Sequence, residues 1–370
     1  MSYPEGKMFS VRLLERDFTN PIILPPVKLI PERYSWNSIG GPLSADISVN
    51  AIGKDSRAIL ELLEYLRCPI EIFDHNQMCV WWGFIDEVEI NIGSVSLSVS
   101  LDSMSNRIAA LYETDTKQKA VTSWVQNDDS VGVYGEKQLL ITSTLTGQSA
   151  AEYFRNEVLN NLKKPISQIS FNDGNGEISA RITGRGWWKT LEWKYYSAAA
   201  GSAVETTTQI ANIITTSGQF FTGTEIKDSS GFSIDPYRAG DNNALFEIET
   251  LLAAGTNTGF RLLSSVGRAR DLIVYKEPVL SSLNDIELFM RENGQVENYY
   301  ANRNISSLCP VGLWMRLKDV IPGSLDLGLV SDPTVLFVEE ASFEVATERY
   351  IPIARGQGSP FGIGTKISEG

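Results

Sequence analysis

Strict alternation of serine with aliphatic residues is the feature that most constrains the fold of this chain. Residues 94–101 read SVSLSVSL, which places valines and leucines on one face of a strand and serines on the other. Successive side chains of a strand point to opposite faces, so this period of two is typical of a half-buried antiparallel strand. The segments 46–51 (DISVNA) and 177–183 (EISARIT) repeat the pattern.

Helical signals are fewer. Apolar stripes, capping residues and a following Gly or Pro predict helices at 55–67, 151–162, 203–214 and 243–254. In the last of these, Asn243 is the expected N-cap and Gly255 the expected stop. We therefore predict a β-rich α+β chain in which strand pairs carry single packed helices.

The length of 370 residues is large for one hydrophobic core, so two domains are expected. We predict a first β-rich domain at 1–112, a polar connector arm at 113–147, a second β-rich domain with helical insertions at 148–350, and a Gly/Ser-rich tail at 351–370. The connector carries Trp124 and Tyr134, which favour an ordered extended arm over a loose linker.

The charge balance excludes several classes of function. The chain has 32 Lys and Arg against 45 Asp and Glu, a net charge of −13, which repels nucleic acid and anionic membranes. Neither a signal peptide nor a transmembrane run of roughly 18 apolar residues is visible. We expect synthesis in the cytoplasm of a host cell and no membrane anchor.

Residues typical of catalytic or metal sites are sparse. His75 is the single histidine, lies in a predicted turn (DHNQM), and has no accompanying nucleophile motif. Cys68, Cys79 and Cys309 are scattered and fit neither a disulfide framework nor a zinc site. We predict that the chain is not an enzyme and holds no metal or cofactor.

One segment faintly resembles a calcium loop. FNDGNGEI (171–178) carries oxygen ligands at alternate positions but lacks the twelve-residue spacing and the terminal bidentate Glu. We interpret it as a hairpin turn that uses Gly174 and Gly176.

Acidic residues are clustered in the predicted strand 84–92. Paired carboxylates can cleave glycosidic bonds. In a strand, however, Glu87 and Glu89 face one side and Asp86 the other. We interpret Glu87 and Glu89 as residues of a solvated or channel-facing surface.

Tryptophan is frequent, with eight residues in the chain. Trp81 and Trp82 are adjacent in a predicted strand and so face opposite sides, and Trp187 and Trp188 form a second adjacent pair. Large aromatic side chains bury much area at low entropic cost, which favours the core or subunit interfaces. Sugar-stacking platforms are the alternative.

Several segments resemble the bacteriophage tail hub, or baseplate hub, family, which includes minor tail proteins of the tail tip. They are RYSWNSIGGPLSADISVNAIG (33–53), 62–90, 98–112 with its pair Asn106 and Arg107, DDSVGVYGEKQ (128–138) and GWWKTLEWKYY (186–196).

This resemblance implies two tube-type β-barrel domains per chain and a homotrimeric ring whose six barrels match a hexameric tail tube. It implies a structural virion protein of the tail tip that caps the tube and contacts the tail tube protein, the tape measure protein, and distal tail or baseplate proteins and fibres. DNA would be met only in passage, and Glu87 and Glu89 are candidates for acidic residues of the channel wall.

Other assignments stay open. A distal tail ring or adaptor would form a hexamer where a hub forms a trimer. A tail-associated carbohydrate-binding or carbohydrate-degrading enzyme, and the hub of a phage-derived contractile device, are the remaining alternatives.

Overall fold

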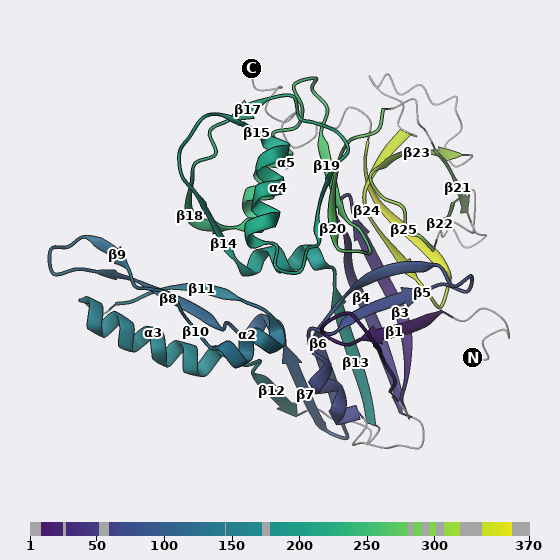
Figure 1. Cartoon of the computed structure of the whole chain (residues 1–370). Coiled ribbons are helices and arrows are strands. Elements are labelled where there is room, and N and C mark those ends of the chain that lie inside the picture. Colours follow the sequence, from purple (N-terminus) through teal and green to yellow (C-terminus); the bar gives the residue numbers. More distant parts are fainter. Residues whose placement is uncertain are drawn as a thin grey trace.

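The computed structural model describes residues 9–24, 27–51, 59–144, 146–171, 178–279, 284–290, 296–300, 307–318 and 335–356. Within these ranges the protein is β-rich and α+β, as the sequence predicts (Figure 1).

A curled, mainly antiparallel sheet forms the body. Its strands are β1 (Ser10–Leu14), β2 (Pro21–Ile22), β3 (Val27–Asn37), β4 (Ile39–Ala51), β5 (Pro69–Phe73), β6 (Cys79–Ile92), β7 (Val95–Ser100), β12 (Ser167–Phe171) and β13 (Ile178–Arg185). The order across the sheet is β3, β4, β13, β6, and the far edge of β6 pairs first with β5 and then with β7. β5 continues to β1 and β2, whereas β7 continues to β12. Because β1 also lies against β3, this part of the sheet curls back on itself.

The alternating segments form the strands that they predict. The register places Val99, Val88, Ile182 and Ile47 side by side across β7, β6, β13 and β4. The last three are fully buried, and each such side chain contributes about 1.5–3 kcal/mol to stability.

Strands from the C-terminal part of the chain extend the sheet beyond β3. They are β21 (Asn284–Met290), β22 (Val296–Tyr300), β23 (Leu313–Lys318), β24 (Val335–Glu344) and β25 (Arg349–Gly356). β24 pairs with β3, β23 and β25, and β21 pairs with β22 and β23. Strands from both ends of the chain therefore share the sheet.

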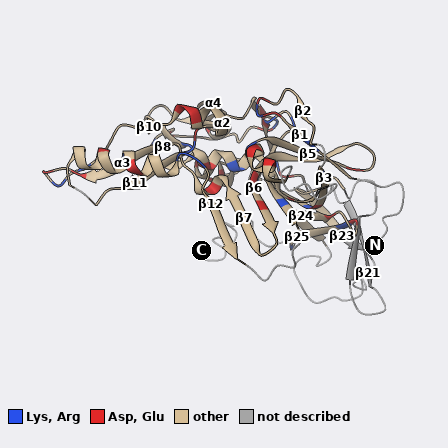
Figure 2. Cartoon of the chain, turned by 90° about the horizontal axis from the view of Figure 1, so that it is seen from below, with Lys and Arg blue, Asp and Glu red and all other residues tan. Residues whose placement is uncertain are grey.

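An arm projects from the body in both views (Figures 1 and 2). It contains β8 (Arg107–Glu113), β9 (Lys119–Val121), β10 (Val125–Gln126), α2 (Asp128–Tyr134), β11 (Gln138–Thr142) and α3 (Gln148–Leu162). β11 runs parallel to β8, and α3 packs on the sheet through Ala151, which clusters with Ala110 and Tyr112. The predicted connector at 113–147 thus lies in a unit that also includes β8 and α3.

A mixed segment follows β13 and lies above the arm in Figure 1. It contains η4 (Trp187–Trp193), β14 (Tyr195–Ala198), β15 (Val204–Glu205), α4 (Thr206–Ser217), β16 (Gly223–Ile226), β17 (Ser233–Ile234), β18 (Arg238–Asn243), α5 (Ala244–Ala253), β19 (Leu262–Val266) and β20 (Asp271–Lys276). α4 and α5 pack together, and β19 joins the turn between β3 and β4 through a short parallel pairing.

The helix predictions at 151–162, 203–214 and 243–254 are confirmed, with ends shifted by up to three residues. The Asn243 side chain accepts a hydrogen bond from the Phe246 amide at 2.9 Å, and Gly255 follows with a φ of +69°. Of the helix predicted at 55–67, the described part is mainly the 3-10 helix η2 (Glu61–Tyr65). The strand predicted at 94–101 ends one residue early, because Leu101 begins the 3-10 helix η3 (Leu101–Ser103).

The hairpin predicted around 171–178 is not formed by the flanking strands. β12 pairs with β7, and β13 pairs with β4 and β6. Residues 172–177 and 357–370 lie outside the described residues. The first six residues of the tail predicted at 351–370 belong instead to the strand β25. The division into domains at 1–112 and 148–350 stays a prediction, and strands from both ranges share the curled sheet.

Candidate functional site: polar sheet face, edge strand and arm joint

One face of the curled sheet is polar and hydrogen-bonded. Glu87 and Glu89 lie on β6, both half-exposed. Glu87 accepts a hydrogen bond from the Ser98 hydroxyl at 2.6 Å, and Glu89 accepts one from the Ser96 hydroxyl at 3.3 Å. The serines of the alternating segment thus bind the carboxylates of the neighbouring strand.

Basic side chains lie on the same face. Arg181 of β13 is directly opposite Glu89 and forms an ion pair with Asp46 of β4 at 3.1 Å. Acidic and basic groups thus lie on neighbouring strands of this face. The face is therefore polar with adjacent charges of both signs, and not uniformly acidic.

Asp86 occupies a different environment from its neighbours. It lies at a β-bulge, where the partner of β13 steps from Ile85 to Glu87. Its residue exposure is 3%, and Arg185 is 3.7 Å away. Burial, reinforced by the charge of Asp102, raises the pKa of Asp86 to about 6.

β12 is an edge strand whose five residues are all exposed. Ile169 and Phe171 are 63% and 81% exposed, and they lie opposite Leu97 and Val95 of β7. Among the described residues β12 pairs with β7 alone. Its outer edge therefore presents backbone donors and acceptors beside apolar side chains.

The joint is the base of the arm, where it meets the body, and it is organised around Asn106, which is fully buried. Its side-chain nitrogen donates to the Ser130 hydroxyl at 3.2 Å and to the Gly135 carbonyl at 2.8 Å. Its side-chain oxygen accepts from the Lys137 amide at 2.8 Å. One side chain thus connects β8, α2 and the start of β11.

Charged residues continue the joint on either side of Asn106. Arg107 pairs with Glu136 at 2.7 Å, and Lys194 lies 3.5 Å from the same carboxylate. Lys137 reaches back to the body, where its ammonium donates to the Leu101 carbonyl at 2.7 Å. Two segments that carry the family resemblance, 98–112 and 128–138, therefore meet at this joint.

The tryptophans named from sequence are largely internal. Trp81 is fully buried, whereas Trp82 is half-buried and packs edge-on against Trp36 at 4.9 Å. Trp187 and Trp188 lie in η4 with exposures of 3% and 8%. Any role of these residues at a subunit interface stays a prediction.

The catalytic and metal candidates named from sequence are His75 and the three cysteines. His75 occupies the turn between β5 and β6, where Asp74 accepts hydrogen bonds from the Asn76 and Met78 amides. In the part of the chain that the structure describes, no three His, Cys, Asp or Glu residues are grouped to hold a metal ion. Burial raises the pKa of the Cys79 thiol to about 12.

No described helix is both long and apolar enough to cross a membrane.

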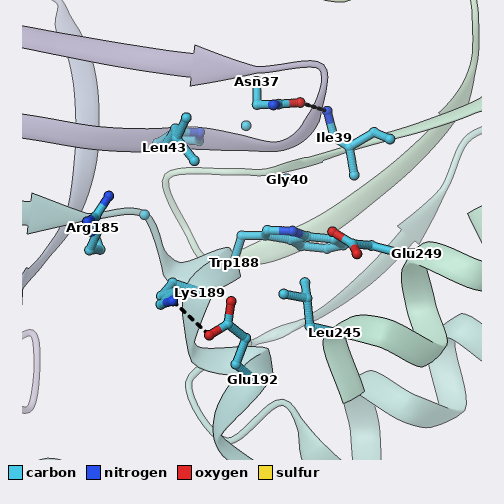
Figure 3. A pocket seen from close by; sticks show the side chains of 13 residues that line it. Asn37, Ile39, Gly40, Leu43, Arg185, Trp188, Lys189, Glu192, Leu245 and Glu249 are labelled. Atoms are coloured by element: carbon cyan, nitrogen blue, oxygen red, sulfur yellow. Dashed lines mark hydrogen bonds and ion pairs between the residues drawn. The ribbon is translucent and has the colours of Figure 1, made fainter. Parts of the chain in front are cut away.

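A pocket of about 400 Å³ lies between the β3–β4 turn, η4 and α5 (Figure 3). Trp188 crosses it between Gly40 and Leu245. At its rim, partial burial and the charge of Glu192 raise the pKa of Glu249. The pocket thus combines an aromatic wall with two interacting carboxylates.

No family model and no curated protein matches the sequence. Three solved structures are similar to it over nearly the whole chain. The tail protein from Neisseria meningitidis MC58 is 9% identical, with coverage of 95% of this chain and 97% of that chain and a TM-score of 0.39. The prophage tail protein gp18 from Listeria monocytogenes EGD-e is 11% identical, with coverage of 97% and 98% and a TM-score of 0.38.

The third is the 43 kDa tail protein of prophage MuSo2 from Shewanella oneidensis, which is 8% identical, with coverage of 94% and 97% and a TM-score of 0.45. All three are described as tail proteins, the class that the sequence resembles.

Proposed function

We propose that this chain is a structural protein of a phage tail, a hub that forms a symmetric ring at the end of the tail tube in the virion. The observation that carries the proposal is the exposed edge strand β12, which carries two exposed apolar side chains and whose outer edge pairs with no described strand. It lies at the margin of a sheet whose adjoining face is polar. The sequence resemblance to tail hubs supports the same assignment.

The edge strand favours assembly with copies of the chain. An edge strand with exposed apolar side chains is prone to pair with other chains, and proteins normally cover, charge or shorten such edges. β12 carries Ile169 and Phe171 and no charged residue. A partner strand added to this edge would bury both side chains and satisfy the open backbone groups. Head-to-tail contacts of this kind close into a ring when the rotation between copies fits.

The polar face suits the wall of a channel. In this proposal Glu87 and Glu89 face the channel, together with the serines that are hydrogen-bonded to them. The described residues of this surface include no cluster of free cations. DNA binds through clusters of cations that release its counterions, so such a wall would let it pass without adhering.

The ring would match the symmetry of the tail tube. The curled sheet and the strands β21 to β25 would form two tube-type barrels per chain, so three chains would present six barrels to a hexameric tube. The partners would be the tail tube protein, the tape measure protein, and distal tail or baseplate proteins and fibres. The chain would then act by binding and not by catalysis.

A second candidate function is carbohydrate binding or cleavage by a tail-associated protein. The observation that favours it is the pocket of Figure 3, where Trp188 adjoins Glu192 and Glu249. Incubation with peptidoglycan or capsule polysaccharide, followed by assay for reducing ends, tests it. If the protein releases reducing ends and Glu249→Gln abolishes that release, the result would support this candidate against the hub.

The mass of the purified assembly tests the hub proposal. Light scattering should give about three times the chain mass of 40.9 kDa, and Phe171→Lys should shift the protein to monomers. Tyr153→Lys is the matched control, because Tyr153 is 68% exposed on α3 of the arm. A hexamer would support the distal ring, and a monomer at high concentration would contradict both.

A further inference from the structure

Five arginines gather at the end of the body where β1 and β5 meet the turn between β19 and β20. They are Arg12, Arg16, Arg67, Arg268 and Arg270. The chain as a whole has a net charge of −13, whereas here five cations gather with Glu71 and Asp17 facing them.

Two of these arginines share one carboxylate. Glu71 accepts hydrogen bonds from Arg12 Nε at 2.9 Å and from Arg268 Nε at 2.7 Å. Burial alone would raise the pKa of Glu71, but the hydrogen bonds from Arg268 and Arg12 outweigh it and lower the pKa. Two guanidinium groups thus face a single negative charge, and the side chains of Arg12 and Arg268 stay 43% and 46% exposed.

Arg270 adds a further positive charge. Its guanidinium carbon lies 3.4 Å from the ring centroid of Phe18. No described residue forms a hydrogen bond or ion pair with this guanidinium group. Burial lowers its pKa. Arg270 is therefore held by an aromatic ring while its hydrogen-bond donors stay available.

The remaining two arginines lie behind this group. Arg67 is 6% exposed and donates to the Val133 and Arg16 carbonyls, the latter at 2.8 Å. Burial, together with the charges of Arg16 and Arg270, lowers the pKa of Arg67 to about 10. The positive charges are therefore close enough to repel one another.

A pocket of about 160 Å³ opens among these groups. Its polar lining includes Arg268, Arg270 and Glu71, and its apolar wall includes Phe18, Trp82 and Trp187. A water molecule occupies about 30 Å³ of liquid, so the volume suits a small charged group with an attached apolar portion.

We infer that this arginine pocket binds an acidic side chain of a partner protein, a Glu or Asp flanked by an aromatic residue. A carboxylate matches the guanidinium fork of Arg270, and the neighbouring aromatic would contact Phe18 and Trp82. Arg268, whose Nε and one Nη bind Glu71, adds positive charge beside it. A DNA backbone presents a long row of phosphates and requires a track of cations, whereas these cations form one compact group beside an apolar wall. The inference goes beyond the hub proposal and does not depend on ring formation.

Calorimetry on the full chain tests it with the peptide acetyl-Gly-Phe-Glu-Glu-Phe-Gly-amide. The same peptide with Gln in place of Glu and a 20-base-pair DNA duplex are the comparison ligands. The acidic peptide should bind, Arg270→Gln should weaken it about tenfold or more, and the Gln peptide should not bind. Lys119→Gln, which removes one exposed positive charge from the arm, should change the affinity less than about twofold.

Arg268→Lys is the second variant, because it keeps the positive charge beside the pocket and leaves the fork of Arg270 intact, and it should weaken binding less than Arg270→Gln does. Thermal melting establishes that each variant is folded. Absence of binding at millimolar peptide, equal weakening by Lys119→Gln, or tighter binding of the duplex would each overturn the inference.

Discussion

The body and the arm are stabilised by different kinds of interaction. In the body, residues far apart in sequence pack a continuous apolar core, with Trp81, Ile47 and Ile182 fully buried on three different strands. The arm has a small core of its own around Ala110 and Ala151, and the hydrogen bonds of Asn106 hold its base together. The base is joined to the body by contacts such as the hydrogen bond from the Lys137 ammonium to the Leu101 carbonyl. The free energy of apolar burial depends little on the direction in which two surfaces meet, whereas a hydrogen bond requires a defined distance and angle. We therefore expect the body to set stability and the joint to set the orientation of the arm.

The largest effect should come from the core of the body. Trp81 is seated where β6 and β13 approach closely, because a side chain at Gly83 or Gly184 would lie 2.7 or 2.8 Å from its ring. Trp81→Ala leaves a cavity that these strands cannot fill, and it should lower the free energy of unfolding by about 3–5 kcal/mol. Urea unfolding measures it, and a loss confined to the arm would contradict the comparison.

The second largest effect should be a dependence of the free energy of unfolding on pH, caused by Asp86 at the boundary of the two regions. Asp86 has a pKa of about 6 against an ordinary 3.8, so the folded protein binds this proton more tightly than the unfolded chain. Its charged neighbours, in order of their effect, are Asp102, Arg185, Lys137 and Lys189. The stabilisation is fully present below about pH 3.8 and is lost as the pH rises through 6, a change of about 3 kcal/mol.

Thermal melting between pH 4 and pH 7 measures this effect. Asp86→Asn should remove most of this slope, whereas Glu87→Gln, a half-exposed neighbour, should leave it in place. An unchanged slope in Asp86→Asn would assign the dependence to other groups.

A smaller and more local effect is expected at the joint. Asn106→Ala removes three buried hydrogen bonds and leaves the Lys137 amide and the Gly135 carbonyl unsatisfied. The cost should be about 1–3 kcal/mol. Hydrogen exchange should accelerate in α2 and β11 before it does in β6 or β13. Uniform acceleration would mean that arm and body unfold as one unit.

The smallest effect on the stability of a single chain is expected at the edge strand. Phe171→Lys alters a side chain that is 81% exposed, so the free energy of unfolding of the monomer should change by no more than about 0.5 kcal/mol. Chemical denaturation at low protein concentration measures it. A large loss would show that β12 supports the fold of the chain itself.

Local patterns were the predictable part of this fold. The predicted strands at 46–51 and 84–92 lie within β4 and β6, because alternation acts within a few positions. The position of β13 between β4 and β6 depends on long-range pairing, which no local pattern encodes. The segment SQISF of β12 has too short an alternation to stand out in sequence.

The candidate sites differ in the same way. Glu87 and Glu89 could be placed on one face from their spacing, but their serine partners come from the strand pairing. The arginine pocket joins Arg12, Glu71 and Arg270, which no motif connects. The contact of Asn106 with the segment 128–138 could be suspected only because both resemble the same family.

Electron microscopy of the purified assembly tests the central claim most directly. The account predicts averaged images of a ring with threefold symmetry and a central channel, in which each copy adds a strand to β12 of its neighbour and turns Glu87 and Glu89 inward. Single globular particles, or rings in which β12 faces solvent and the polar face lies on the outside, would contradict it.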